Sequence, residues 1–160
     1  MILALDPGTT QTGYIFYDGR VSRGIQDGSF ECGILPNAEM LGLVKAWNGP
    51  LACEMIASYG MAVGREVFET CVWIGRFIQA HHSPDKVQLI YRQQVKLHLC
   101  KSTKAKDANV RQAIIDLFEP SGCGTVPQVG TKSNPGPLYG VSSHVWPALG
   151  VAITALSEKQ

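Results

Sequence analysis

Short apolar runs separated by turn residues fill the first third of the chain. They predict strands over residues 2–5, 14–18 and 29–35, because each run is bounded by Gly, Pro or Asp-Gly turn signals. A turn of small residues, Pro7 to Thr12, joins the first two runs. Since the connections are short, the three strands are expected to pair as an antiparallel meander.

Apolar positions at helical spacing dominate the rest of the chain. They predict helices over residues 37–47, 64–81, 107–118 and 144–157. Short apolar strands are predicted at residues 51–56 and 87–91, and a strand that follows a helix and is apolar throughout is typical of a buried parallel pair. The order of elements predicts an α/β protein. Its mixed five-stranded sheet, with three antiparallel strands and then parallel strands, is flanked by helices.

The composition is that of a folded chain of ordinary domain size. Of its 160 residues, 45% are hydrophobic and 17% charged, which suits one globular domain over residues 1–160. No apolar run approaches the roughly 18 residues of a membrane helix, and no basic flank precedes the N-terminal apolar run as in a secretory signal. The 5 cysteines are an odd number without a CxxC pair, so we expect reduced thiols in a cytoplasmic protein without membrane attachment.

Two carboxylates stand in otherwise apolar strands. Asp6 ends the first strand, where a charge is costly unless it is paired or holds a metal. Asp6 is equally well interpreted as a residue that caps the tight turn through its own side chain. Glu54 interrupts the strand at residues 51–56, and the alternative there is an edge strand with a solvated glutamate. Apolar flanks on both sides of Glu54 favour a functional site.

Positive charge is concentrated in one segment of a chain whose net charge is only +1. Against one acid, Asp107, it holds Arg92, Lys96, Lys101, Lys104, Lys106 and Arg111. Such a cluster suits the phosphates of a polyanion, although lysine-rich stretches are more often solvated helix surfaces.

A long connection and a single histidine precede the last predicted helix. Residues 121–142 are rich in Gly, Pro, Ser and Thr and are about twice the usual loop length, which indicates a functional or a mobile loop. Lys132 and Tyr139 are its candidates for nucleic-acid contacts. His144 lies in the first turn of the last helix, where it is either a metal ligand, a neutral hydrogen-bond donor or a surface residue.

Four segments, in this order, carry a family resemblance: residues 2–8 with Thr12-Gly13, Cys53-Glu54, residues 91–110, and residues 143–152. Together they resemble RuvC-type Holliday-junction resolvases of the ribonuclease H-like superfamily, most closely the small RuvC-like endonucleases of bacteriophages and prophages. The segments are similar to the family's opening strand with its catalytic aspartate, its catalytic glutamate, its DNA-contacting segment and its last helix. The resemblance covers nearly the whole chain and implies the ribonuclease H-like fold.

The resemblance also implies an activity. It is a metal-dependent, structure-selective endonuclease that hydrolyses phosphodiesters in four-way or other branched DNA, leaving 5′-phosphate and 3′-hydroxyl ends. Asp6, Glu54 and His144 are the implied catalytic residues and metal ligands, for Mg²⁺ or Mn²⁺ and, in the family's arrangement, for two ions. Where the family has a further ligand, three residues after His144, this chain has Pro147, which cannot bind a metal.

Branched DNA and a second copy of the chain are the implied partners. The expected DNA-binding residues are Tyr59, Arg92, Lys96, Lys101, Lys104, Lys106, Arg111 and Lys132. Tyr59 is placed either to unstack bases at the junction or to pack internally. Two symmetric cuts imply an isologous homodimer, for which helix 64–81 with Trp73 and Phe77 is the candidate surface.

Three other functions stay open on the sequence. Asp6 to Thr10 also matches the phosphate loop of actin-like and sugar-kinase domains, although those proteins need a second similar half for which 160 residues leave no room. Pro147 keeps open a non-catalytic relative that binds junctions or RNA. A nuclease that processes structured RNA is the third alternative.

Overall fold

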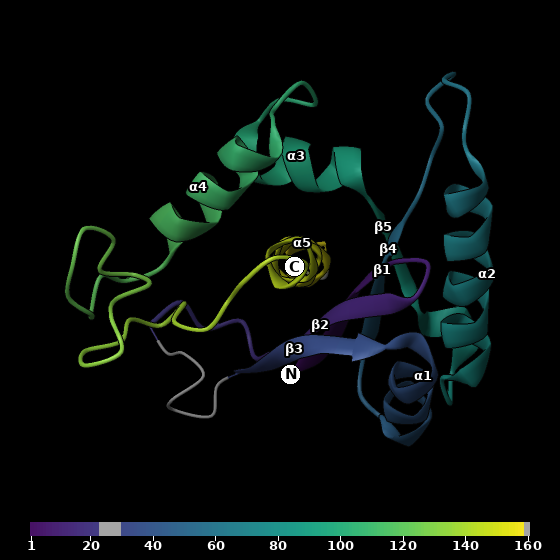
Figure 1. The fold of residues 1–160 in the computed structure, drawn as a ribbon, viewed down its shortest axis with the longest axis horizontal. Coiled ribbons are helices and arrows are strands. Elements are labelled where there is room, and N and C mark those ends of the chain that lie inside the picture. Colours follow the sequence, from purple (N-terminus) through teal and green to yellow (C-terminus); the bar gives the residue numbers. More distant parts are fainter. Residues whose placement is uncertain (23–29, 159–160) are drawn as a thin grey trace.

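The computed structural model describes residues 1–22 and 30–158 of the chain and contains a five-stranded mixed sheet (Figure 1). In the sheet order β3-β2-β1-β4-β5, the strands are β3 (Phe30–Pro36), β2 (Gln11–Tyr17), β1 (Ile2–Pro7), β4 (Leu51–Met55) and β5 (Gln88–Tyr91). Strands β1, β2 and β3 pair antiparallel, while β4 runs parallel to β1 and β5 parallel to β4. The predicted fold class is confirmed. Ser29, where the third strand was predicted to begin, lies outside the described residues.

Helices cover both faces of the sheet. On one face lie α1 (Asn37–Ala46) and α2 (Arg65–Ala80), and a 3-10 turn, η2 (Pro84–Lys86), leads from α2 to β5. The other face carries α5 (Val145–Ser157), with α3 (Arg92–Cys100) and α4 (Asp107–Leu117) outside it. Figure 1 shows α5 end-on between the strands and the α3–α4 layer. A helix enclosed in this way must be apolar nearly all round, and 9 residues of α5 are buried.

The central strand β1 is buried on both faces. Successive side chains of a strand point to opposite faces. Ile2 and Ala4 pack in the core beneath α5, whereas Leu3 and Leu5 pack in the core beneath α1 and α2. The same alternation continues to Asp6 and directs its side chain to the α5 face. Because β1 lies between two cores, it is apolar from Ile2 to Leu5, and Asp6 is its first charged residue.

A buried polar pair fixes the turn between β1 and β2. The Thr12 hydroxyl donates to the Asn37 side-chain carbonyl at 2.7 Å, and the Asn37 amide donates to the Gly8 carbonyl at 2.9 Å. The backbone N–H of Asn37 also donates to the carbonyl of Thr10 at 3.0 Å. The first residue of α1 thus holds the turn that follows Asp6.

Replacing Asn37 with alanine is expected to destabilise the protein by about 2 kcal/mol, because the buried Thr12 hydroxyl and Gly8 carbonyl lose their partner. For a chain of this size the midpoint of thermal unfolding should fall by about 4–8 °C. Differential scanning calorimetry measures the change. An unchanged midpoint would show that the two hydrogen bonds do not hold the turn.

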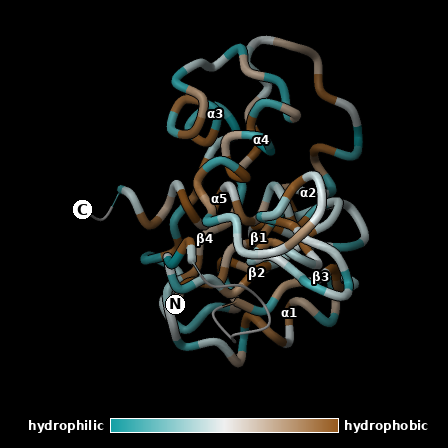
Figure 2. Tube along the Cα trace, turned by 90° about the vertical axis from the view of Figure 1, so that its left-hand side faces the viewer, coloured by the Kyte–Doolittle hydropathy of each residue, from teal (hydrophilic) through white to brown (hydrophobic). Residues whose placement is uncertain are grey.

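The connection from α4 to α5 is built on internal hydrogen bonds rather than being open. Gly122 N–H donates to the Pro127 carbonyl, and Gly136 N–H to the Val129 carbonyl, both at 2.9 Å. Leu138, which is fully buried, anchors the segment in the core beneath α5. Figure 2 shows the hydrophobic residues gathered in the strands and in α5, with hydrophilic positions recurring along α3 and α4.

The structure describes the state of the cysteines and the character of the helices. All five cysteines are free, with Cys53 buried, three others half-buried and Cys123 exposed. Within the described residues, no helix combines the length and the apolar character needed to cross a bilayer.

The candidate dimer surface on α2 differs from the prediction. Phe77 is fully buried in the core beneath α1 and α2, so its assignment to a surface is wrong. Trp73 is half-buried, with its ring 5.9 Å from that of Phe77. The exposed apolar side chains of α2 are Phe68 and Val72, each 63% exposed. The apolar periodicity of α2 identified the helix but not which of its two apolar faces is inward.

Candidate active site

Two carboxylates meet where the parallel strands β1 and β4 end. The strands pair Leu3 with Leu51 and Leu5 with Cys53, so the next residues in that register are Asp6 and Glu54. Both side chains lie on the α5 face and are largely covered, with exposed fractions of 16% and 14%. Strand β4 lies between β1 and β5, which excludes the alternative of a solvated edge-strand glutamate. The structure thus brings together two residues that are 48 positions apart in the sequence.

His144, the residue before α5, completes the contact with Asp6. Its Nδ1 lies 3.2 Å from Oδ2 of Asp6, and half of its side chain is exposed. The hydrogen bonds of Asp6 go to side chains rather than to the backbone of the turn, which argues against the turn-capping interpretation. Gly13, opposite Asp6 in β2, makes the approach of α5 possible. A Cβ atom on Gly13 would lie 2.8 Å from the Cβ of His144.

Arg92 and Asp107 form the other side of the site. Arg92 follows β5 directly, and its Nε lies 3.9 Å from Oε1 of Glu54. Its Nη2 donates to Oδ1 of Asp107 at 2.7 Å. Asp107 begins α4 and is 77% exposed, whereas the Arg92 side chain is only 24% exposed. A chain of charges therefore runs from the sheet edge to the outer helical layer.

Burial raises the pKa of both carboxyl groups at the strand ends. The pKa of Asp6 rises to about 6 and that of Glu54 to about 8, chiefly because both are desolvated. The interaction between the two carboxyl groups lowers the pKa of Asp6 and raises that of Glu54, so Glu54 ionises less readily than Asp6. The charge of Arg92 lowers both values in part. A pair with raised and separated pKa values is typical of functional sites.

In the ion pair beyond Glu54, the pKa of Asp107 is lowered and the pKa of Arg92 is raised. The hydrogen bond from Arg92 holds the pKa of Asp107 below its usual value. Burial lowers the pKa of Arg92, but Asp107, Glu54 and Asp6 outweigh that effect and raise it overall. Among the described residues, Oε2 of Glu54 and Nη1 of Arg92 are buried side-chain atoms without a hydrogen-bond partner. Unsatisfied buried atoms of opposite charge call for a ligand.

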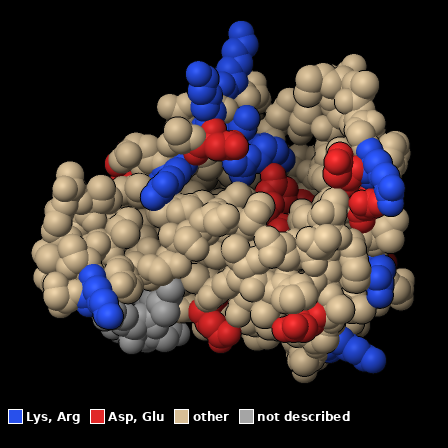
Figure 3. All heavy atoms as spheres, in the orientation of Figure 1, with Lys and Arg blue, Asp and Glu red and all other residues tan. Residues whose placement is uncertain are grey.

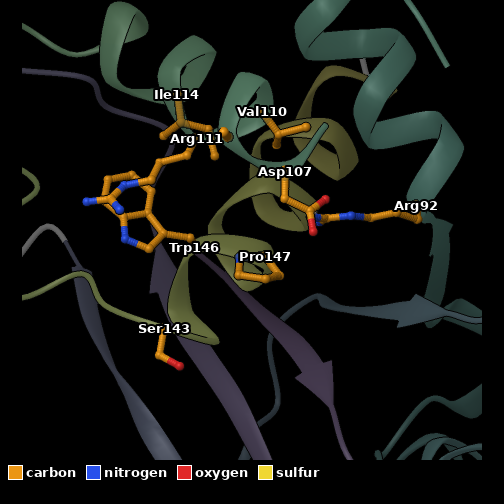
Figure 4. Close-up of a pocket in the computed structure, with 9 residues that line it drawn as sticks. Arg92, Asp107, Val110, Arg111, Ile114, Ser143, Trp146 and Pro147 are labelled. Atoms are coloured by element: carbon orange, nitrogen blue, oxygen red, sulfur yellow. The ribbon is translucent and has the colours of Figure 1, made fainter. Parts of the chain in front are cut away.

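A pocket of about 390 Å³ adjoins the charged residues between α4 and α5 (Figure 4). The Arg92–Asp107 pair lies at one end and Arg111 at the other, where its guanidinium carbon lies 4.7 Å from the centre of the Trp146 ring. Pro147, in the first turn of α5, faces the pocket at the position where the family resemblance implies a metal ligand.

Most of the predicted DNA-binding residues lie on the outer layer of the molecule. Exposed positions between α3 and the start of α4 carry Lys101, Lys104 and Lys106, and Lys96 is half-buried. Figure 3 shows basic side chains over α3 and α4, next to acidic side chains in the hollow between that layer and α2. Lys132 is exposed in the α4–α5 connection, and Tyr59, 48% exposed, lies between β4 and α2.

The side chains at the ends of β1 and β4 are of the kinds that bind a hard divalent cation. Asp6 and Glu54 offer adjacent carboxylates, one of them with an unpartnered oxygen, and such oxygens are what Mg²⁺ and Mn²⁺ prefer. His144 adds an imidazole beside Asp6. Across residues 1–22 and 30–158, however, no three His, Cys, Asp or Glu side chains are grouped closely enough to hold a metal ion. The site would therefore need to rearrange to surround a cation.

Sequence reasoning identified Asp6, Glu54 and His144, and the structure brings these three together. It did not foresee that Arg92 joins them or that Arg92 pairs with Asp107. Arg92 could have been found from its position directly after a predicted parallel strand, because the carboxyl ends of parallel strands meet at one edge of a sheet. No sequence feature placed Asp107 opposite Arg92.

The chain was compared with known proteins. No protein-family model and no curated protein sequence matches it. Among solved structures it is similar to Thermus thermophilus RuvC in complex with a Holliday junction substrate, with a TM-score of 0.62 and 18% identity over 99% of this chain and 93% of that one. A second T. thermophilus RuvC structure gives a TM-score of 0.55 and 19% identity over 99% and 95%. At this identity the likeness establishes that the chain has the RuvC fold.

Proposed function

We propose that the protein is a metal-dependent, structure-selective endodeoxyribonuclease that resolves four-way or other branched DNA junctions, acting as one nuclease domain over residues 1–160. The observation that carries the proposal is the pairing of Asp6 and Glu54 at the ends of adjacent parallel strands, with raised pKa values, in a RuvC fold. The sequence resemblance further suggests the phage or prophage type and a cytoplasmic location.

The reaction is hydrolysis of a phosphodiester. The oxygen of a water molecule bonds to phosphorus, the bond from phosphorus to the 3′ oxygen breaks, and the products are a 5′-phosphate and a 3′-hydroxyl. The attacking water loses one proton and the departing oxygen gains one. His144, hydrogen-bonded to Asp6 and half exposed, is suited to exchange one of these protons with solvent.

Asp6 and Glu54 would hold Mg²⁺ or Mn²⁺, with His144 as a nitrogen ligand. When bound, such an ion makes a water molecule more acidic and stabilises charge on the phosphoryl oxygens. The carboxyl groups would release protons when they bind the cation, because the pKa of Glu54 is raised to about 8.

DNA would approach over the α3–α4 layer. The exposed lysines of that layer, with Lys132 and Arg111, would contact phosphates and set the register of the junction without reading its sequence. Tyr59 lies in the connection after β4, the strand that carries Glu54, and is exposed enough to stack on a base. Glu54 and Asp107 engage two of the guanidinium nitrogens of Arg92, Nε and Nη2, which leaves Nη1 for a contact with DNA.

Two symmetric cuts require two sites, and a homodimer is the partner that we propose. Replacing Phe68 with glutamate on the exposed face of α2 is expected to give a monomer, because a charge would replace an apolar contact at the two-fold axis. Sedimentation velocity measures the mass of the particle. Glu66→Gln, on the same exposed turn, is the control and should leave the mass unchanged. A Phe68→Glu variant that remains dimeric would exclude this face as the interface.

The proposal is tested by offering wild-type protein a labelled four-way DNA junction, a linear duplex of the same sequence and a structured RNA, each with Mg²⁺ and then Mn²⁺. We expect paired nicks in the junction and little cutting of the other two. Junction binding without cleavage would instead support a non-catalytic relative, for which Pro147 is the motivating feature. Faster cutting of RNA would support an RNA-processing nuclease. Failure to bind any of them, with binding of ATP, would favour the nucleotide-binding alternative.

A further inference from the structure

Arg92 is the one basic side chain, among the described residues, that forms an ion pair with Glu54. It follows β5, the strand next to β4, and so enters the site from the same edge of the sheet. Its guanidinium spans Glu54 at 3.9 Å and Asp107 at 2.7 Å, with the third nitrogen, Nη1, buried and unpartnered in the described structure. Figure 4 shows the group extended toward Asp107, above Pro147.

The ligand set beside Arg92 is short of what two cations need. Pro147 offers no side-chain donor, which leaves Asp6, Glu54 and His144 as the candidate ligands. His144 is already engaged with Asp6. Two divalent ions would have to share Asp6, Glu54 and His144 with Arg92 in place.

The charges of the site also favour one divalent ion over two. Asp6, Glu54 and Asp107 carry three negative charges when ionised, and Arg92 carries one positive charge. The remainder of two negative charges is neutralised by one divalent ion. A second divalent ion would leave two positive charges next to a guanidinium in a largely buried site, which is unfavourable at low dielectric.

We propose that Arg92 is a built-in cation that takes the role of a second metal, so that the site works with one divalent ion per chain. This rests on the nuclease function proposed above and adds a residue and a metal count to it. A guanidinium presents its N–H groups as a planar fork that matches two phosphate oxygens. The phosphoryl group gains one negative charge as water adds and gives up a proton, and the free Nη1 hydrogens of Arg92 are available to stabilise that charge. Asp107 holds the guanidinium by its other edge and is a positioning residue.

The first experiment counts metal ions without DNA and without turnover. Mn²⁺ is titrated into the wild type and into Arg92→Gln, and free Mn²⁺ is followed by electron paramagnetic resonance. We expect one Mn²⁺ per wild-type chain, and at least tenfold tighter binding in Arg92→Gln, since a positive charge 3.9 Å from Glu54 has been removed. Arg20→Gln, which removes the same charge from a residue whose described ion pair is with Asp18, is the control and should bind Mn²⁺ as the wild type does.

The second experiment measures single-turnover cleavage of a four-way junction at saturating Mn²⁺. Arg92→Gln is expected to cut about 100-fold more slowly although it binds the metal more tightly. Arg92→Lys, which keeps the charge and loses the planar fork, should fall between the two. If Arg92 had only a structural role, its substitution would weaken metal binding and cleavage together. Tighter metal binding with slower cleavage therefore identifies the proposed role.

The outcomes separate this inference from the function on which it rests. Two Mn²⁺ per wild-type chain, or an Arg92→Gln variant that cuts as fast as the wild type, would overturn the role of Arg92 and leave the nuclease function standing. A wild type that never cuts branched DNA would overturn the function itself. The Mn²⁺ titration would still report whether Arg92 opposes metal binding at Glu54.

Discussion

Replacing Glu54 with glutamine is expected to stop cleavage while making the metal-free protein more stable at alkaline pH. Activity should fall by about 10³-fold or more, because the site loses the carboxylate that would hold the metal. Stability should rise because Glu54 sits in a site that favours its neutral form. Burial is the largest cause of its raised pKa, followed by the charge of Asp6.

The direction of the pH effect follows from proton linkage. The pKa of Glu54 is about 8 in the folded protein against 4.5 for the free side chain. The folded state therefore holds a proton that the unfolded chain releases between these values. The contribution of protonated Glu54 to the stability of the fold is fully present below about pH 4 and is lost as the pH rises through 8. Glutamine cannot ionise, so Glu54→Gln does not suffer this loss.

Thermal unfolding in the presence of a chelator measures the effect. At pH 9 we expect Glu54→Gln to be about 2 kcal/mol more stable than the wild type, or about 4–8 °C higher in midpoint, with a small difference at pH 4. Glu66→Gln, at an exposed position of α2, is the control and should change neither pH dependence nor cleavage. Parallel stability curves for wild type and Glu54→Gln would contradict the buried, proton-holding carboxyl pair.

Replacing Gly13 with alanine is expected to disable the site without touching a charged residue. A Cβ atom on Gly13 would lie 2.7 Å from the carbonyl carbon of His144 and 2.8 Å from its Cβ, so the start of α5 must move away from β2. Such overpacking costs about 2–3 kcal/mol. The hydrogen bond between His144 and Asp6 would be lost with it, and we expect cleavage to fall by about 100-fold.

Gly42→Ala is the matched control for this steric effect. Gly42 lies in α1 with no atom within 4 Å of an added Cβ, so alanine there should leave cleavage unchanged and stabilise the helix by about 0.5–1 kcal/mol. Calorimetry and a junction-cleavage assay on both variants decide the question. Wild-type stability and activity in Gly13→Ala would show that α5 does not depend on the close approach at Gly13.

The fold was predictable because its strongest signals are local. Strand β1 lies between two cores, so it is a continuous apolar run, and Asp6 stands out at its end. Glu54 stands out in β4 for the same reason. Once the parallel register is known, alternation alone puts both carboxylates on one face, which is why two widely separated residues could be identified as one site.

The features that sequence reasoning missed depend on contacts between elements. Phe77 lies on an amphipathic helix, but only the packing of α2 on the sheet decides that Phe77 is buried and Phe68 is exposed. The pairing of Arg92 with Asp107 joins the end of β5 to the start of α4 across 15 positions, with an entire helix between them. The sequence shows a basic segment, but composition alone does not reveal which of its basic side chains points toward the carboxylates.

The most direct test of the central claim compares wild type with Asp6→Asn on a labelled four-way DNA junction, with Mg²⁺ and with Mn²⁺, and maps the cut sites on all four strands. Junction affinity, measured on the same samples, shows whether the variant still binds. The carboxylate site predicts symmetric paired nicks by the wild type, and binding without nicks by Asp6→Asn. Nicks that persist in Asp6→Asn would place the chemistry elsewhere, and a wild type that binds but never cuts would contradict the nuclease function.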